Sequence, residues 1–143
     1  MLICCPHCHR KNRLEPARLD ANPTCGACKQ ALFTGQPLSL SSTTFAKHAS
    51  ADLPMVIDFW ASWCGPCQQF APVFAKAATA FEPRARLAKV DTETAPDLAA
   101  RFAIRSIPTL LILHRGQAVA RLNGAVPPQE FARWLDTHLP AIT

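Results

Sequence analysis

The sequence has no apolar run long enough to cross a membrane. A helical span needs about 20 consecutive apolar residues, and the apolar stretches in these 143 residues are much shorter. The first residues, Met1–Pro6, also lack the basic segment followed by an apolar segment that marks a secretory signal. We therefore expect a cytoplasmic protein with no membrane partner.

A strong charge of one sign is also absent. The formal net charge is +5, from 15 Lys and Arg against 10 Asp and Glu, and this alone is weak support for nucleic-acid binding. The first 37 residues hold five basic side chains but only one Phe, Tyr or Trp, which is Phe33. Bases would have little to stack on there, so we do not expect a nucleic-acid partner.

Cysteine, in contrast, is plentiful. The chain has seven cysteines, which fall at positions 4, 5 and 8, at 25 and 28, and at 64 and 67. In a protein without an export signal, such spacing indicates metal binding or redox catalysis more than a framework of structural disulfides.

The first two groups predict one structural zinc ion. Two Cys-x-x-Cys pairs, Cys5/Cys8 and Cys25/Cys28, are separated by sixteen residues, the arrangement of a zinc ribbon with four thiolate ligands. A segment of fewer than about 40 residues buries too little apolar surface to fold without a cross-link such as a bound metal ion. We therefore predict a zinc-ribbon-like module over residues 1–37.

Other interpretations of this segment stay open. The four cysteines could form two disulfides, or stay reduced in a disordered segment. Cys4, His7 and His9 are rival ligands. Cys4 breaks the two-residue spacing, so we treat it as a bystander that could be a reactive thiol. The basic module could also make the protein a binding or adaptor protein.

The alternation of apolar strand and helix patterns over residues 38–143 predicts an α/β domain with a mixed sheet and helices on both faces. We expect the domain to begin near 36–38. Its predicted strands are 38–40, 55–60, 86–91, 109–114 and 117–122, with a turn at Arg115-Gly116, and its predicted helices are 45–50, 65–81, 95–102 and 127–138.

The third cysteine pair lies where the predicted strand 55–60 leads into the long helix. Gly65 and Pro66 keep the loop tight, and proline suits a first helical turn. Cys64 then lies at the helix N-terminus, where free N–H groups and the helix dipole favour a negative sulfur. We predict that Cys64 attacks a disulfide and that Cys67, which we expect to be less accessible, resolves the mixed disulfide. A third zinc knuckle would need a partner pair, and none remains.

Asp58 is the one charged residue in the apolar strand 55–60. In a central strand both faces are covered, so its carboxyl group is expected to be buried and to hold its proton tightly. It could then act as a base toward Cys67. Alternatively, Asp58 lies at the strand end and reaches solvent.

The motifs of residues 38–143 resemble the thioredoxin family. The resemblance is carried by residues 58–67 (DFWASWCGPC), Ala71-Pro72, Lys89, residues 104–109 (IRSIPT) and Asn123-Gly124-Ala125. With the four-cysteine module in front, the chain is similar to the zinc-binding thioredoxin 2 type of bacteria. One departure is Gln68, where many relatives have Lys or Arg.

The resemblance implies a thioredoxin fold and a protein-disulfide reductase. It implies a cis peptide at Ile107-Pro108, a client-docking surface around the dithiol, and Lys89 as a charge partner of Asp58. Thioredoxin reductase would supply electrons from NADPH, oxidised cytoplasmic proteins would be the clients, and the protein would be a monomer. The zinc thiolates could also sense oxidants. The docking residues are Trp63, Gly65, Pro66, Ile107, Pro108, Gly124 and Ala125.

Overall fold

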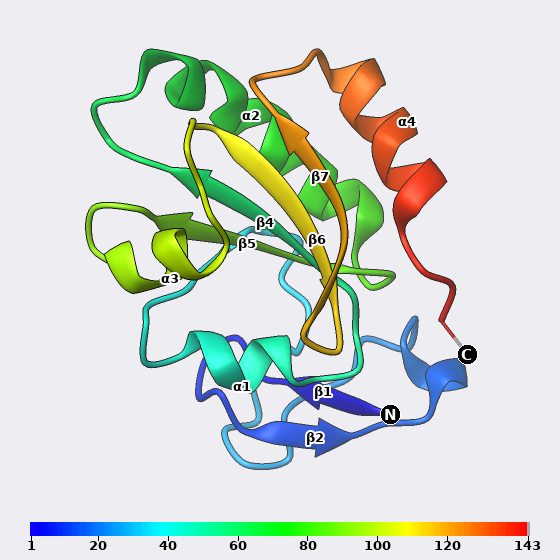
Figure 1. Ribbon diagram of the computed structural model, residues 1–143. Helices are drawn as coiled ribbons and strands as arrows, with labels where there is room; N and C mark the ends of the chain where they lie inside the picture. The colour runs from blue at the N-terminus through cyan, green and yellow to red at the C-terminus, as the bar shows by residue number, and fades with distance from the viewer. Residues whose placement is uncertain (143) are drawn as a thin grey trace.

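A computed structural model describes residues 1–142 and shows a five-stranded sheet with a small cysteine-rich module beneath it (Figure 1). The elements, in chain order, are β1 (Leu2–Cys4), β2 (Lys11–Arg13), a 3₁₀ turn (Pro16–Arg18), β3 (Leu38–Ser39), α1 (Phe45–Ala49), β4 (Met55–Trp60), α2 (Gly65–Phe81), β5 (Arg86–Asp91), α3 (Pro96–Arg101), β6 (Thr109–His114), β7 (Gln117–Asn123) and α4 (Pro128–His138).

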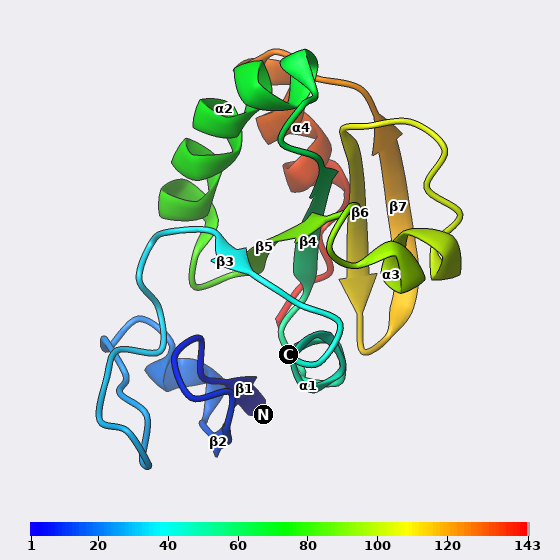
Figure 2. The ribbon, with the colours of Figure 1, turned by 90° about the vertical axis from the view of Figure 1, so that its left-hand side faces the viewer.

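The sheet is mixed, in the order β3-β5-β4-β6-β7. β3 and β4 pair parallel to β5, whereas β6 pairs antiparallel to β4 and β7. Helices α2 and α4 cover one face and α1 and α3 the other (Figure 2). The predicted fold class, a thioredoxin fold with helices on both faces, is confirmed.

The central strand β4 contributes to both hydrophobic cores because its side chains alternate between the two faces. Ile57 and Phe59 are fully buried against α1 and α3, and Val56 is fully buried against α2 and α4. Such a strand, covered on both sides, is expected to be apolar throughout. Asp58 is the exception, and it lies on the same face as Val56.

The predicted boundaries of the strands and helices in residues 38–138 hold to within one residue at each end. The Arg115-Gly116 turn between β6 and β7 has φ values of 51° and 81°, a conformation that suits glycine at the second position. Strands β1 and β2 and the 3₁₀ turn were not predicted. Within residues 1–142, no helix combines the length and the apolarity needed to span a bilayer.

The cysteine-rich module packs directly against the rest of the protein. Its small core includes Ile3 and Leu32, and Leu53, from the segment before β4, is buried in the same cluster. The amide of Leu2 donates to Asp52 at 2.6 Å. The predicted division at residues 1–37 and 38–143 stays a prediction, but these contacts show that the two parts share buried surface.

A buried ion pair lies at this junction. Arg86, at the start of β5, pairs with Glu82 at 3.3 Å, and their side chains are 6% and 3% exposed. Arg86 also donates to the carbonyl oxygen of Cys4 at 2.9 Å, and Glu82 accepts from the amide of Gly35 at 2.9 Å. Both members of the pair therefore reach from the sheet domain into the cysteine-rich module.

Candidate functional site

Cys64 and Cys67 lie at the N-terminus of α2, just beyond the end of β4 (Figure 1). The two residues are joined by a disulfide, with their Cα atoms 5.2 Å apart. Cys64 is the N-cap of the helix, and its sulfur accepts the amide of Cys67 at 3.2 Å. Pro66 lies in the first turn. The helix terminus therefore presents backbone donors to the Cys64 sulfur, as the sequence predicts.

Both cysteines are buried in this oxidised form. Cys64 is 4% exposed and Cys67 is 3% exposed. The two values differ too little to test the expectation that Cys67 is the less accessible, which stays a prediction. What separates their roles is position, since Cys64 caps the helix and Cys67 lies one turn inside it.

Asp58 is buried, at 1% exposure, and both of its carboxylate oxygens lack a hydrogen-bond partner among the described residues. Burial raises the pKa of Asp58 to about 7, against a smaller lowering by the charge of Lys89. Lys89 is the β5 residue opposite Asp58, but its ammonium group lies over the Trp60 ring, 4.5 Å from the ring centre. The interpretation of Asp58 as a solvent-exposed strand end is therefore wrong.

The predicted docking residues from distant segments come together beside the dithiol. The Ile107–Pro108 peptide is cis, and the carbonyl oxygen of Ile107 lies 3.7 Å from the Cys64 sulfur. The amide of Gly124 donates to the carbonyl oxygen of Pro108 at 2.8 Å. Gly124 has a φ of +101°, where a side chain would be strained. Ala125 follows it and is exposed.

Trp63, the residue before Cys64, is also exposed. Its side chain is 68% exposed, and its indole nitrogen donates to Glu93 at 2.6 Å. Glu93 was not predicted, because it lies in the loop after β5 and no local pattern links it to Trp63. Gln68 donates to the carbonyl oxygen of Ser62 at 2.7 Å. This hydrogen bond ties the first turn of α2 to the loop that carries Trp63 and Cys64.

The four predicted metal-binding cysteines, Cys5, Cys8, Cys25 and Cys28, form one cluster at the other end of the sheet. All four sulfurs lie within 4.8 Å of one another. Cys5 and Cys28 are 3.6 Å apart, as are Cys8 and Cys25. These separations exclude disulfides between those partners, since a disulfide is about 2.05 Å long. They suit a tetrahedral Zn–thiolate site, in which bonds of about 2.3 Å place sulfurs about 3.8 Å apart.

The thiols of the cluster influence one another, and their pKa values shift in opposite directions. Backbone N–H groups, that of Cys28 first, lower the pKa of Cys25 to about 5, whereas the lowering of the pKa of Cys28 by the N–H of Gln30 is outweighed by burial and the neighbouring thiols, which raise it to about 11. The amide of His7 likewise donates to the sulfur of Cys5 at 3.3 Å. Donors aimed at sulfur are what a metal–thiolate centre requires, so the residues present fit a metal ion such as zinc.

The rival ligands are engaged elsewhere. His7 is exposed and its ring bonds the carbonyl oxygen of Ala31 at 3.2 Å. His9 pairs with the buried His48 at 2.9 Å. Cys4 is 2% exposed and donates to the carbonyl oxygen of His9, and burial raises the pKa of Cys4 to about 11. Cys4 therefore lies outside the four-sulfur cluster, and its burial disfavours the thiolate that a reactive cysteine needs.

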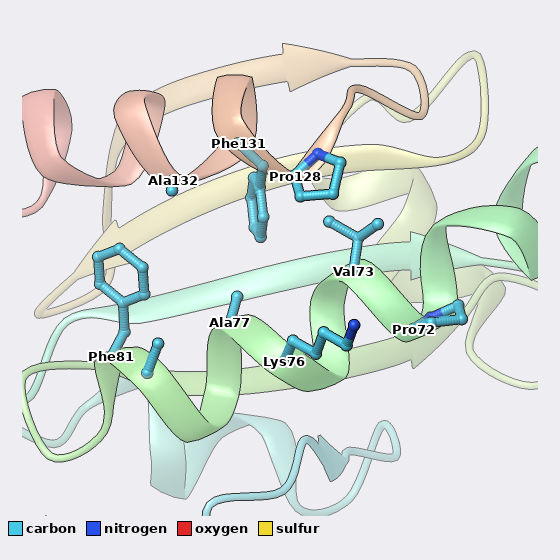
Figure 3. A pocket seen from close by; sticks show the side chains of 9 residues that line it. Pro72, Val73, Lys76, Ala77, Phe81, Pro128, Phe131 and Ala132 are labelled. Atoms are coloured by element: carbon cyan, nitrogen blue, oxygen red, sulfur yellow. The ribbon is translucent and has the colours of Figure 1, made fainter.

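An apolar groove of about 230 Å³ lies between α2 and α4, separate from both cysteine sites (Figure 3). Val73 and Ala77 of α2 point across it toward Phe131 of α4. The groove holds no nucleophile and one charged side chain, that of Lys76. Its chemistry therefore adds nothing to the dithiol site.

Comparisons with known proteins agree with this site. A family model described as Thioredoxin matches residues 36–137. Thioredoxin C-3 of Corynebacterium nephridii is 44% identical over 140 residues, which cover 97% of this chain and 96% of that protein. Thioredoxin 1 of Nostoc sp. is 41% identical over 101 residues, 70% of this chain and 94% of that protein. Neither name mentions zinc, so the comparisons do not distinguish the zinc-binding subtype.

Proposed function

This chain belongs to the thioredoxin family of thiol–disulfide oxidoreductases, and we propose that it reduces disulfides in oxidised client proteins. The observation that carries the proposal is the Cys64–Cys67 disulfide at the N-terminus of α2, beside the cis Ile107–Pro108 peptide. A vicinal dithiol at a helix terminus can ionise, attack and reclose.

The reaction needs two thiol exchanges. The Cys64 thiolate attacks one sulfur of a client disulfide, which forms a mixed disulfide and releases the other client sulfur as a thiolate. Cys67 then loses its proton and attacks the sulfur of Cys64. The client leaves with both sulfurs reduced, and the two electrons it has gained come from the dithiol, which ends as the disulfide seen here.

Asp58 is suited to receive the proton of Cys67. Its pKa of about 7 lets it be ionised in part of the molecules at neutral pH and still bind a proton readily. It lies on the face of β4 that α2 covers, where Cys67 is also buried. We propose Lys89 as the charge that keeps its pKa from rising further.

We propose that the oxidised protein is reduced again by thioredoxin reductase with electrons from NADPH. The support is family membership together with the exposed Trp63 and the groups around Ile107 and Gly124, which offer one surface to reductase and clients.

The test is NADPH-coupled reduction of insulin with thioredoxin reductase. Cys64→Ser should abolish turnover, because no attacking thiol remains. Cys67→Ser should stop the reaction at the mixed disulfide, which can be isolated as a covalent complex with the client. Turnover by Cys64→Ser at the wild-type rate would disprove the mechanism.

We also propose that Cys5, Cys8, Cys25 and Cys28 hold one structural zinc ion. Zinc bound there would cross-link the two loops of a module too small to fold on apolar burial alone. Zinc content measured by mass spectrometry should be one per chain, and Cys5→Ser should lower the affinity by orders of magnitude. Cys4→Ser is the matched control and should keep full zinc content. Equal zinc affinity in both variants would contradict the ligand assignment.

A further inference from the structure

The docking surface depends on two separate segments staying in register, and one buried hydroxyl contacts both. Thr109 is the first residue of β6, directly after cis Pro108, and it is 1% exposed. Its hydroxyl donates to the carbonyl oxygen of Ser106 at 2.5 Å. The same hydroxyl also points to the Oδ1 oxygen of Asn123, the residue before Gly124, at 3.2 Å.

These contacts form a closed arrangement. Thr109 and Asn123 are direct partners in the β6–β7 ladder, and the amide of Gly124 donates to Pro108 at 2.8 Å. A hydroxyl has one proton to give and two lone pairs. Its single proton therefore lies between two acceptors, with the shorter bond to the carbonyl oxygen of Ser106 and the longer one to Oδ1 of Asn123.

The same residue is tied to the strand that delivers the dithiol. Thr109 pairs with Phe59 of β4, and the chain continues from Phe59 through Trp63 to Cys64. The carbonyl oxygen of Ile107, in the loop that the hydroxyl closes, lies 3.7 Å from the Cys64 sulfur. A shift of the 106–108 loop would thus move the docking groups relative to the attacking sulfur.

We propose that Thr109 is a positioning residue for client docking, whose hydroxyl fixes the 106–108 loop against Asn123-Gly124. Thr109 does not touch the client, because it is buried. The role concerns extended protein substrates, which must contact both segments at once, and not small disulfides, which need only the dithiol. The inference rests on the proposed reductase function.

The test compares two substrates in single turnovers of the pre-reduced full-length protein. Insulin serves as the protein disulfide and dithiobis(nitrobenzoate) as the small one. Thr109→Val removes the hydroxyl and keeps the shape. We expect the half-saturating insulin concentration to rise roughly two- to tenfold, the worth of one neutral hydrogen bond, with an unchanged maximal rate. The rate with the small disulfide should not change.

Two controls separate positioning from general damage. Thr109→Ser keeps the hydroxyl and should behave like the wild type. Thr137→Val makes the same change at a hydroxyl on α4, away from the dithiol, which donates to the carbonyl oxygen of Arg133. It should leave the kinetics with both substrates unchanged. An equal loss with both substrates for Thr109→Val, or no loss with either, would overturn the proposal.

A second readout does not depend on activity. Amide hydrogen exchange at Gly124 should be several-fold faster in Thr109→Val than in the wild type or Thr109→Ser. The reason is that the hydrogen bond from Gly124 to Pro108 is no longer stabilised by the neighbouring Thr109 hydroxyl. Unchanged exchange would overturn the positioning role. A wild type that fails to reduce insulin would instead refute the proposed function, and Gly124 exchange would still decide whether Thr109 fixes the two segments.

Discussion

Single charged residues in apolar strands carry much of the functional information in this chain. Asp58 interrupts the apolar run of β4, and the sequence predicts both its burial and its raised pKa. Arg86 gives the same signal at the start of β5, where it is 5% exposed, yet its role was not predicted. The difference is that its partners, Glu82 and the backbone of the cysteine-rich module, are brought to it only by the tertiary fold.

The raised pKa of Asp58 predicts a pH-dependent stability. Between the ordinary value of 3.8 and about 7, the folded protein holds a proton that the unfolded chain has released. Stability contributed by this group is thus present below pH 4 and is lost as the pH rises to 7. Asp58→Asn has no carboxyl group to ionise and keeps this stability, so at pH 8 the free energy of unfolding of the oxidised variant should exceed that of the wild type by about 4 kcal/mol.

Urea unfolding of the oxidised proteins from pH 4 to pH 8 measures this difference. The two stability curves should meet near pH 4, separate up to about pH 7 and then run parallel. Asp20→Asn, at an exposed carboxylate, is the control and should track the wild type. A constant offset between Asp58→Asn and the wild type would show that Asp58 does not titrate in this range.

At the scale of elements, the sequence predicts those helices and strands that are long enough to show a periodic pattern of apolar residues. The helical spacing of Phe70, Phe74 and Phe81 defines α2, and the apolar run before the cysteines defines β4. The strands β1 and β2 have three residues each and pair only with each other. They could not be predicted because a three-residue strand has no measurable periodicity, and this hairpin is held by the fold around the cysteine cluster.

Helix α4 depends on few residues, since only Phe131 and Leu135 are buried along its length. The Phe131 ring meets Phe70 of α2 edge to face, with ring centres 5.1 Å apart. Phe131→Ala would enlarge the groove between α2 and α4 (Figure 3) and should destabilise the protein by about 3–5 kcal/mol.

Chemical denaturation at pH 7 checks the role of Phe131. Phe131→Leu, which fills most of the volume, should lose clearly less stability than Phe131→Ala. Val119→Ala, at an exposed strand position, should lose almost none. A loss below 1 kcal/mol for Phe131→Ala would mean that α4 closes over the gap and that its attachment does not depend on this ring.

At the scale of the molecule, the two cysteine sites lie at opposite ends of the sheet (Figure 1). The dithiol follows the C-terminal end of β4, and the four-cysteine cluster lies below the N-terminal ends of β4 and β5. Strand β5 spans this distance, with Arg86 bonded to Cys4 and Lys89 opposite Asp58. Strand β4 gives a second route, since Asp52 and Leu53 before it contact the module and the chain continues from β4 to Cys64. Any influence of the module on the redox site, including the predicted oxidant sensing, has these two strands as its most direct routes.

Each member of the buried pair Arg86–Glu82 also hydrogen-bonds the backbone of the cysteine-rich module, so loss of the pair should destabilise both parts. Arg86→Met leaves Glu82 buried without its partner and leaves the carbonyl oxygen of Cys4 without its donor. Breaking such a pair costs about 3–5 kcal/mol. The pKa of Glu82, already raised by burial and held down by Arg86, should rise further, so the variant should lose more stability as the pH increases.

The same variant should release zinc more readily, because Arg86 braces the chain next to Cys5. Transfer of zinc to a chromogenic chelator, measured beside urea unfolding, reports both effects. Arg84→Met is the matched control, since its pair with Asp136 is exposed at 60% and 63% and should contribute below 1 kcal/mol. If Arg86→Met loses stability but its zinc transfer matches that of Arg84→Met, the cysteine-rich module holds its metal independently. Coupled losses would mean that the module and the redox domain unfold together, as one cooperative unit joined at Arg86.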